Sequence, residues 1–531
     1  MAKYRSKTNY AQIYGGDRGG INLGLDGAIF LKEETTPRTF NPPVIGTQGT
    51  STSGATPSLD ISAGSDNALK IAVDGGAVVD VVLVQAGKTS GALIAAELET
   101  KINAALLAAG QDARVWVEFS GGLYIIHSQS AGAGSSVVVT NATANNVADD
   151  LKLGLANTGV EAVGVADEDF LLYTTGGPTF SQAIESNAHR SGRFHSGVVK
   201  AKKMAEFSIS TYVNMSGSAG DSIDKAVKLL WKGLLGSETV VPSTSIQYRQ
   251  ALPGTYMSLV RVSTIFAEYY TGAYVKDMTM TFPGDGPATC EWSGKAEKRI
   301  IAGIAKVNGA VVASPNVVVE AGETDRYDVG APVMLVDVDG RTILYGADGS
   351  LTISSITALS NQLTLSGSVD VADNTFVVPW HPGAVSLTGR DNIFTDLEGS
   401  LKLQQSGSNI CVTNAQLTFT NDHVDFDNCF GADANKGFAA ANRMTMALAV
   451  TFDLSNANFA EVVQSANFEG YAPEIILGAV SGRHLKITAP KWIPAVPSIE
   501  VPENGVTPVT LEGNLYQSSP GAQDPILVEF K

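Results

Sequence analysis

The stretch Arg443–Asn467, RMTMALAVTFDLSNANFAEVVQSAN, decides how the rest of the chain is interpreted. Its first part alternates large apolar side chains with small or polar ones. That period of two predicts a strand with one buried face. The next residues, Ser455–Asn456, are good helix N-caps, and apolar residues at helical spacing follow them. A short amphipathic helix is therefore expected directly after the strand.

A second stretch of this kind lies upstream. Residues Ala205–Val213, AEFSISTYV, alternate in the same way, and a Gly/Ser-rich turn follows them. Apolar residues then lie on one face of a predicted helix that Gly236 closes: Ile223, Val227, Leu230, Trp231 and Leu234. Two strand-then-helix units indicate a duplicated domain.

The composition favours a mainly β protein of several domains. A chain of 531 residues predicts roughly three to four domains. Hydrophobic residues make up 44% and charged residues 17%, which is ample material for packed cores. Because the chain has 55 glycines and many Val, Thr and Ser residues, short strands and turns are favoured over helical bundles.

The net charge of −17 makes this chain a poor candidate for wrapping DNA through phosphate contacts. An acidic surface could still form a wall past which DNA moves without sticking. Cys290, Cys411 and Cys429 include no CxxC pair, so neither a disulfide framework nor a zinc site is predicted. We see no secretory signal and no uninterrupted apolar run of about 18 residues, so no membrane span is expected and the chain should be made in the cytoplasm.

Changes in pattern along the chain predict five segments. They are an extended arm or linker at 1–57, a β/α module at 58–165, a β-domain at 166–300, a small β-barrel or sandwich at 301–384, and a second β-domain at 385–531.

The 58–165 segment resembles the hook-IN type repeat of flagellar cap, hook-associated and flagellin proteins. The similarity lies in the strands around Gly75–Gly76, the helix SGALIAAELETKINAAL at 90–106, the strand pair around Gly121–Gly122, and NNVADDLKLG at 145–154. The resemblance implies a surface-decorating module with no catalytic residues to carry over.

The two β-domains resemble the major tail tube proteins of long-tailed bacteriophages. The similarity is carried by ICVTNAQLTFTNDHVDFDNCFG at 410–431, VTPVTLEGNLYQSSPGAQDPILVEF at 506–530, and HRSGRFHSGVVKAKKMAEFSISTYV with LLWKGLLG between 189 and 236. The resemblance implies β-sandwiches, each with a flanking helix, that polymerise as stacked rings around a DNA-conducting lumen in a virion tail. Partners would be the chain itself, other tail proteins such as tape measure and terminator, and DNA that passes without specific binding.

This chain departs from the simplest tail tube proteins, because it carries two tube-like units and two inserted modules. A trimer whose duplicated domains imitate sixfold symmetry is therefore an alternative to a plain hexamer. Other interpretations are a different tail component, such as a sheath protein, and a flagellar or adhesin-like filament protein. Long heptad-bearing helices at both termini, typical of a flagellar protein, are absent from the sequence.

The clearest constellation of reactive residue types is DHVDFDNC at 422–429. It could be a divalent-metal loop or a Cys429–His423 pair, but its spacing does not match an EF-hand, and an exposed acidic loop is the expectation. There is no G-x-S-x-G elbow, and GGDRGGINLG near the N-terminus lacks the P-loop lysine. We therefore predict a protein that is not an enzyme, with no catalytic residue, cofactor or metal.

Two sets of residues are predicted to serve assembly. A basic loop with Arg190, Arg193 and Lys200 could contact nucleic acid, but it lacks the array of aromatic residues on which single-stranded bases stack. On a chain of net charge −17 it is expected instead to contact an acidic loop with Asp422, Asp425 and Asp427 in the next ring. The small and polar faces of the two strands are expected to line the lumen through Ser208, Ser210, Thr445, Thr451 and Asp453.

Overall fold

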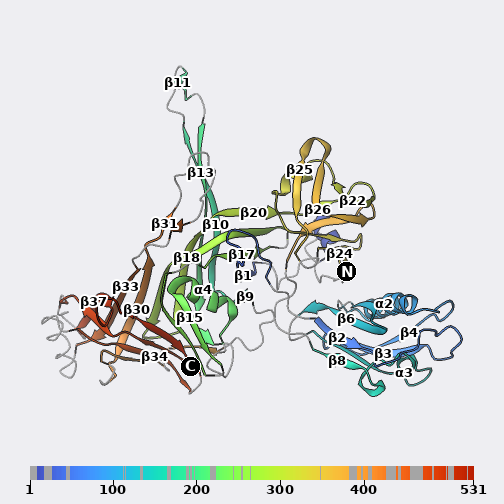
Figure 1. Cartoon of the computed structure of the whole chain (residues 1–531), viewed down its shortest axis with the longest axis horizontal. Coiled ribbons are helices and arrows are strands. Elements are labelled where there is room, and N and C mark those ends of the chain that lie inside the picture. Colours follow the sequence, from blue (N-terminus) through green and yellow to red (C-terminus); the bar gives the residue numbers. More distant parts are fainter. Residues whose placement is uncertain are drawn as a thin grey trace.

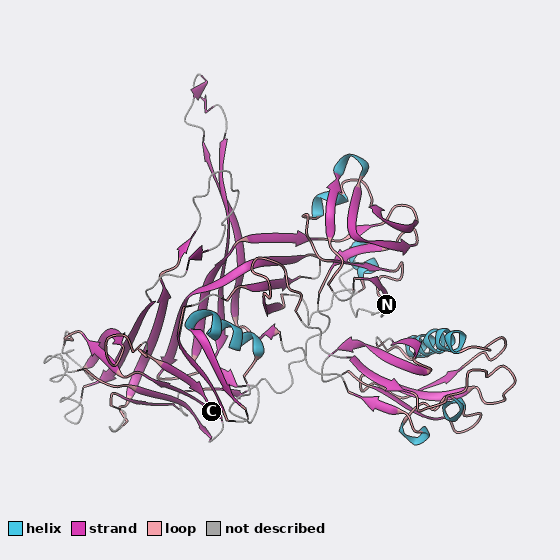
Figure 2. Cartoon of the chain, viewed as in Figure 1, coloured by secondary structure: helices cyan, strands magenta, loops and turns pink. Residues whose placement is uncertain are grey.

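The computed structural model describes the chain except for 1–8, 17–26, 44–47, 112, 114, 132–134, 164–168, 187–189, 192–193, 196–197, 216–222, 243, 253–254, 264, 347–348, 382–391, 396–398, 405–408, 426–437, 440–443, 455–469, 481–482, 498, 500–506 and 523. Strands dominate the described residues, and the few helices are short apart from α2 and α4 (Figure 2). The mainly β class is confirmed.

The largest sheet runs through both predicted tube-like units (Figure 1). Its main path is β10 (Thr175–Ser186), β13 (Val198–Tyr212), β19 (Thr289–Ala296), β18 (Ala267–Pro283), β30 (Val412–Asn421), β33 (Met444–Asp453), β37 (Pro508–Tyr516) and β36 (Lys491–Pro494). Strand β33 confirms the strand predicted from the alternation. The helix predicted after it falls in 455–469, outside the described residues.

A second sheet forms the opposite layer. Its order is β15 (Gly236–Val241), β16 (Ser245–Gln250), β38 (Leu527–Phe530), β35 (Arg483–Thr488), β34 (Glu474–Val480) and β29 (Gly399–Lys402). Helix α4 (Lys225–Leu235) lies against β15, β16 and β18, and ends at Gly236 with φ 86°, as predicted. Trp231 from α4 meets Trp292 from β19 edge-on in the shared core, with ring centroids 5.2 Å apart.

The strands of the two tube-like units therefore share one sandwich instead of forming two separate ones. Strand β18 of the first unit pairs with β30 of the second, and β16 pairs with the C-terminal strand β38. Alternation along a strand shows which face is buried, but not which strand lies beside it.

The N-terminal part of β18 belongs to a side sheet that joins the sandwich to the 301–384 module. There it pairs with β17 (Met257–Val262) and β20 (Lys298–Ala302), and β1 (Ile29–Glu33) joins β17 and β9 (Phe170–Leu171). Ile29 and Leu31 of β1 face the sandwich core, whereas Phe30 faces the module's core.

The 301–384 module consists of two small sheets on one core, and neither closes into a barrel over its described residues. One has the order β21 (Ala305–Lys306), β27 (Phe376–Pro379), β23 (Val333–Val336), β24 (Ile343–Tyr345), and the other β22 (Val311–Val318), β26 (Gln362–Val371), β25 (Ile353–Thr357). The short helix α1 (Tyr10–Tyr14) docks on it. The Tyr14 hydroxyl donates a hydrogen bond to Glu323 at 2.8 Å. Burial, and to a smaller extent this hydrogen bond, raise the pKa of Tyr14 to about 12.

The other module has a core of its own. Its sheets are β5 (Val115–Ser120), β6 (Leu123–Ala131), β2 (Gln48–Thr52), β8 (Val160–Ala162), and β4 (Val79–Val82), β3 (Ala68–Val73), β7 (Val137–Asn141). Helix α2 (Gly91–Ala108) packs beside them, and the Ser90 side chain accepts a hydrogen bond from the N–H of Leu93, as the predicted cap requires. The first 57 residues thus place α1, β1 and β2 in three different parts of the molecule.

Across the described part of the chain, we find no helix that is both long enough and apolar enough to span a membrane.

Candidate assembly surfaces

The main sheet is built from two halves with the same strand order. The first half runs β10-β13-β19-β18, and the second runs β30-β33-β37-β36. In each half the last two strands along the chain exchange places in the sheet, so that the fourth strand lies between the second and the third. The two halves therefore have the same topology as well as the same spatial arrangement. The halves lie side by side, with β18 at the end of one and β30 at the start of the other.

The two halves also share their register. Gly294 pairs with Phe207 on one side, and its neighbour Lys295 pairs with Tyr274 on the other. Gly513 pairs with Leu448, and its neighbour Asn514 pairs with Ile493. Phe180 of β10 and Phe419 of β30 correspond in the same way, since they pair with matching residues of β13 and β33. The match shows an internal duplication.

Strands β18 and β30 form the joint between the halves. Met278 pairs with Phe419, Met280 with Leu417, and Phe282 with Ala415, and all these side chains lie in the sandwich core. Backbone pairing and apolar burial therefore hold the two halves together. Asp277 lies on the opposite face of the joint, and burial raises the pKa of its carboxyl group.

The outer ends of the duplicated sheet are β10 and β36. Over the described residues, β10 pairs with β13 alone and β36 with β37 alone among the strands. Other groups occupy parts of these edges: the Arg261 guanidinium donates to the carbonyl of Pro178 at 3.4 Å, and the N–H of Trp492 donates to the carbonyl of Tyr471 at 2.8 Å. By the correspondence above, β36 is the counterpart of β18, and β10 is the counterpart of β30.

The predicted lumen residues lie on the face of the main sheet that points away from the core. Met446, Leu448, Val450 and Phe452 of β33 are buried, so Thr445, Thr451 and Asp453 lie on the other face, and Ser208 and Ser210 do so on β13. This face also carries Glu206, Asp277, Glu291 and Glu512, and Lys276 and Lys295 line a hollow of about 310 Å³ on it.

The predicted inter-ring residues that the structure describes lie toward one end of the sandwich. Strands β10 and β13 extend beyond the sheet as a hairpin, with β11 (Arg190–Ser191) at its tip (Figure 1). Lys200 lies on β13 in this hairpin, and Asp425 lies on β31 (Val424–Asp425) at the same end. Asp422 is exposed next to β30. Arg193 and Asp427 lie outside the described residues.

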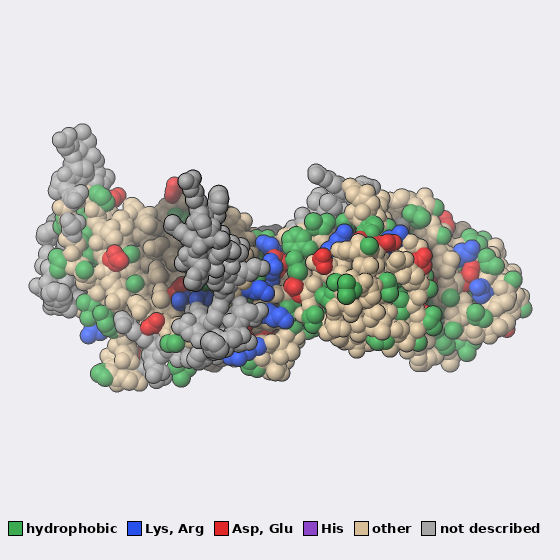
Figure 3. Space-filling model, turned by 90° about the horizontal axis from the view of Figure 1, so that it is seen from above, with side chains coloured by type: hydrophobic (Ala, Val, Ile, Leu, Met, Phe, Trp, Pro, Cys, Tyr) green, Lys and Arg blue, Asp and Glu red, His purple; other side chains and the backbone are tan. Residues whose placement is uncertain are grey.

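Figure 3 views the molecule from this end. Acidic, basic and hydrophobic side chains are interspersed over the modules on the right, while Lys and Arg side chains gather near the centre of the view. Charges of both signs are thus available on this surface for contacts with another molecule.

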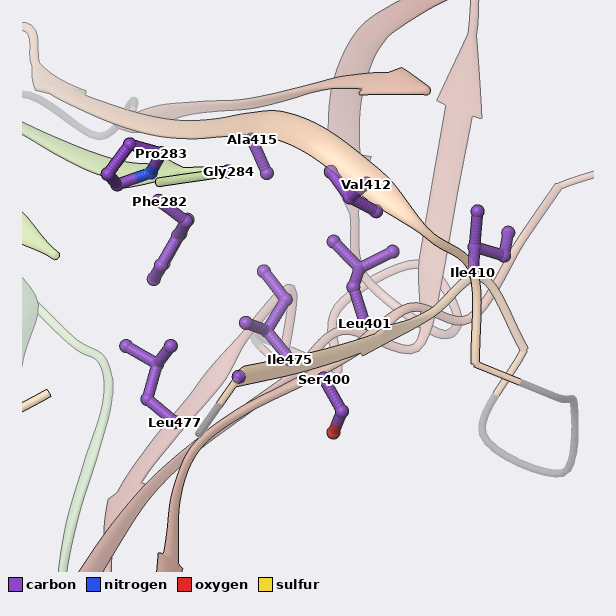
Figure 4. A pocket seen from close by; sticks show the side chains of 11 residues that line it. Phe282, Pro283, Gly284, Ser400, Leu401, Ile410, Val412, Ala415, Ile475 and Leu477 are labelled. Atoms are coloured by element: carbon purple, nitrogen blue, oxygen red, sulfur yellow. The ribbon is translucent and has the colours of Figure 1, made fainter. Parts of the chain in front are cut away.

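The apolar pocket of about 150 Å³ in Figure 4 opens at the opposite end of the joint. Residues in or next to β18, β29, β30 and β34 line it: Phe282, Pro283, Gly284, Gly399, Ser400, Leu401, Ile410, Val412, Ala415, Ile475 and Leu477. None of these side chains is an acid, a base or a strong nucleophile. The pocket therefore offers a place to pack apolar groups rather than a site for proton transfer.

The reactive residue types do not converge elsewhere in the described residues. No group of three or more His, Cys, Asp or Glu with metal-binding geometry occurs among them. Cys290 is buried in the core, and burial raises the pKa of its thiol, which disfavours the reactive thiolate. His423 lies against Tyr274, with ring centroids 5.3 Å apart, and Cys429 is outside the described residues.

Sequence reasoning did not identify the joint residues or the two open edges. A usable signal was present: FPGDGP at 282–287 and VPENGV at 501–506 have the same length and turn composition, and they precede the corresponding strands β19 and β37. Aligning these two loops would have set the duplicated halves in register.

No protein-family model and no curated protein matches the chain. Of the solved structures, a chain of "Virion of native gene transfer agent (GTA) particle" is similar over 22% of this chain and 90% of that chain, with 12% sequence identity and a TM-score of 0.18. The resemblance is to a virion component, and at this TM-score it decides neither fold nor function.

Proposed function

We propose that the chain is a structural virion protein whose copies join laterally into rings, and that these rings stack into a tail tube. The observation that supports this most directly is the duplicated sheet. The joint between its halves uses β18 and β30, and the counterparts of these strands, β36 and β10, are the strands at the two outer ends. The part of β18 that pairs with β30 begins at Asp277, and its counterpart begins at Val496, just beyond the end of β36. We propose that one copy offers this extension of the β36 edge to β10 of the next copy.

Repetition of one head-to-tail joint closes a ring when its rotation divides a full turn. Because each copy supplies two equivalent half-sheets, a trimer would present six of them around the axis. The second sheet of the sandwich could also continue from copy to copy around the ring, because β15 of the first unit and β29 of the second unit lie at its two outer ends. A ring of three copies with pseudo-sixfold symmetry is thus our preferred assembly.

The face of the main sheet that points away from the core would line the channel. Its serines, threonines and carboxylates are small or negatively charged, and DNA phosphates would be repelled rather than bound by the carboxylates. Lys276 and Lys295 lie beside Glu206 and Asp277, so their positive charges are balanced locally. DNA would pass such a wall without a specific contact.

Stacking would use the two ends of the sandwich. The projecting β10–β13 hairpin carries Arg190 and Lys200, and we propose that it contacts the opposite end of the next ring. Asp422 and Asp425 lie at the same end as the hairpin (Figure 1), so rings stacked in one direction would not bring the two predicted sets together. Terminal rings would meet other tail proteins through the same ends. This role requires no catalytic residue, cofactor or metal.

Electron microscopy of the purified full-length chain tests the proposal. We expect hollow, non-contractile rods of stacked rings, formed at high protein concentration. Compact monomers at every concentration, observed together with a folded circular dichroism spectrum, would refute self-assembly. Solid filaments without a channel would refute the tube.

A further inference from the structure

The outer edge of the second half differs from the inner joint at two positions. Counting from the matched residues Tyr274 and Ile493, Val275 corresponds to Pro494 and Met278 to Pro497. Met278 pairs with Phe419 across the inner joint. The pairs between β18 and β30 begin at Asp277, so Val275 lies just outside that joint. Proline has no backbone N–H, so neither Pro494 nor Pro497 can donate a backbone hydrogen bond to a neighbouring strand.

The backbone geometry places the first missing donor on the outer side. The N–H of Trp492 points outward to Tyr471, and that of Ala495 points inward to the carbonyl of Glu512. Since N–H groups alternate sides along a strand, the nitrogen of Pro494 faces outward, where a second copy would pair. Strand β36 also ends at Pro494, whereas its counterpart β18 continues to Pro283 between two partner strands.

The residues beyond Pro494 nevertheless suit a joint. Ile499 corresponds to Met280, which is fully buried in the inner joint, yet Ile499 is 39% exposed. This apolar side chain would lose its contact with water if a copy of β10 paired beside it. The β36 edge thus offers an apolar side chain for burial, but its prolines cannot donate backbone hydrogen bonds to a strand of another copy.

We infer that Pro494 and Pro497 limit lateral association between copies of this chain, so that the outer joint is a weaker version of the inner β18·β30 joint. The inference rests on the proposed function and names β10 of a second copy as the partner. Natural sheets use edge prolines in this way to prevent indiscriminate pairing. The inner joint forms whenever a chain folds, whereas the outer joint would form only when many weak contacts act together in rings.

The test places the corresponding residues of β18 at these two positions of the full-length chain. Pro494→Val, Pro497→Met and the double variant are compared with wild type by sedimentation velocity over a range of concentrations. Pro494→Val supplies an outward-facing N–H, and one further hydrogen bond should lower the concentration for half-association by about two- to tenfold. Pro497→Met supplies the side chain that packs in the core at the inner joint and should lower that concentration as well. Pro315→Thr, in strand β22 of the 301–384 module, is the matched control and should leave that concentration unchanged.

A third variant covers the case in which a proline replacement disturbs the fold. Ile499→Lys puts a charge on a side chain that is already partly exposed, so the monomer should fold normally, while association should weaken by at least tenfold. If wild type associates and the folded proline variants associate at the same concentration, the inference is wrong. If neither wild type nor any variant associates, the proposed self-assembly itself fails.

Discussion

Gly294 and Gly513 hold the same position in the two halves of the main sheet. A Cβ atom on Gly294 would collide with the carbonyl oxygen of Tyr274, and a Cβ atom on Gly513 would collide with that of Ile493. Each glycine therefore lets a neighbouring strand approach closely at the point where the halves correspond. Duplication has preserved a backbone requirement along with the strand order.

Replacing either glycine by alanine should destabilise the sandwich. We expect Gly513→Ala and Gly294→Ala each to lower the free energy of unfolding by about 1–3 kcal/mol, because the neighbouring backbone must move. Urea unfolding followed by tryptophan fluorescence measures the change. Gly367→Ala is the control, since an added Cβ there would meet Leu351 at an ordinary 3.7 Å. Equal losses in control and test variants would contradict the shared role.

A disulfide between copies tests the proposed register of the outer joint. Asp277 pairs with Thr420 in the inner joint, and the corresponding residues are Val496 of one copy and Ser181 of the next. Directly opposed residues have Cβ separations that suit a disulfide. We expect Ser181→Cys with Val496→Cys, in a Cys411→Ser background, to give covalent multimers on oxidation of the assembled protein.

The control for this cross-link shifts the register by two residues. Thr179→Cys with Val496→Cys places the thiols too far apart along the strand, and the yield on non-reducing gels should be low. Similar yields from both pairs would show that the edges do not meet in the register of the inner joint.

Glu474 should make stability depend on pH in the acid range. Burial alone would raise the pKa of this carboxyl group, but Lys486 at 2.8 Å and Lys402 at 3.4 Å more than offset burial and lower it. A lowered pKa in the folded state contributes stability that is present above the unfolded value of 4.5 and is lost as the pH falls through the folded value. This ion-paired group joins β29, β34 and β35.

Glu474→Gln should therefore reduce the free energy of unfolding by about 1 kcal/mol at pH 7, and by much less near about pH 3.5. Urea titrations at both pH values measure the difference. Glu291→Gln, at an exposed position on the main sheet, is the control. A loss that stays constant with pH would show that the glutamate acts through packing rather than charge.

Removal of the module between β1 and β9 should leave the sandwich folded. These strands pair with each other at the base of the insertion, where Lys32 and Asp169 form an ion pair at 2.9 Å. The module has its own core, so replacing 48–162 by a short flexible linker removes little of the sandwich packing. We expect narrower rods at the wild-type concentration for assembly, measured by negative-stain microscopy. Loss of rods from a folded variant would instead place this module in the assembly contacts.

The sequence predicts local elements better than it predicts their partners. Alternation at 444–454 identifies β33, and the Ser90 cap identifies the start of α2, because strand period and helix caps are local properties. The joint between Met278 and Phe419 joins residues far apart in the chain. Its strand pairing depends on the duplicated register, which periodicity alone does not reveal.

For the candidate surfaces, too, the sequence predicts local features but not the strands that lie beside them. The small and polar residues around Ser208 and Thr451 are recognisable from alternation, since the opposite face is apolar. The open ends at β10 and β36 are not, because an edge strand differs from a central one only in what lies beside it. Pro494 and Pro497 indicate an edge strand, but this becomes clear only when they are compared with the corresponding residues of the first half, Val275 and Met278.

A cryo-electron microscopy reconstruction of the assembled full-length chain tests the central claim most directly. The account predicts rings of three copies, in which the main sheet continues from the β36 end of one copy into β10 of the next with the register of β18 and β30. Rings in which both β10 and β36 remain exposed to solvent, with the copies joined through other surfaces, would contradict it.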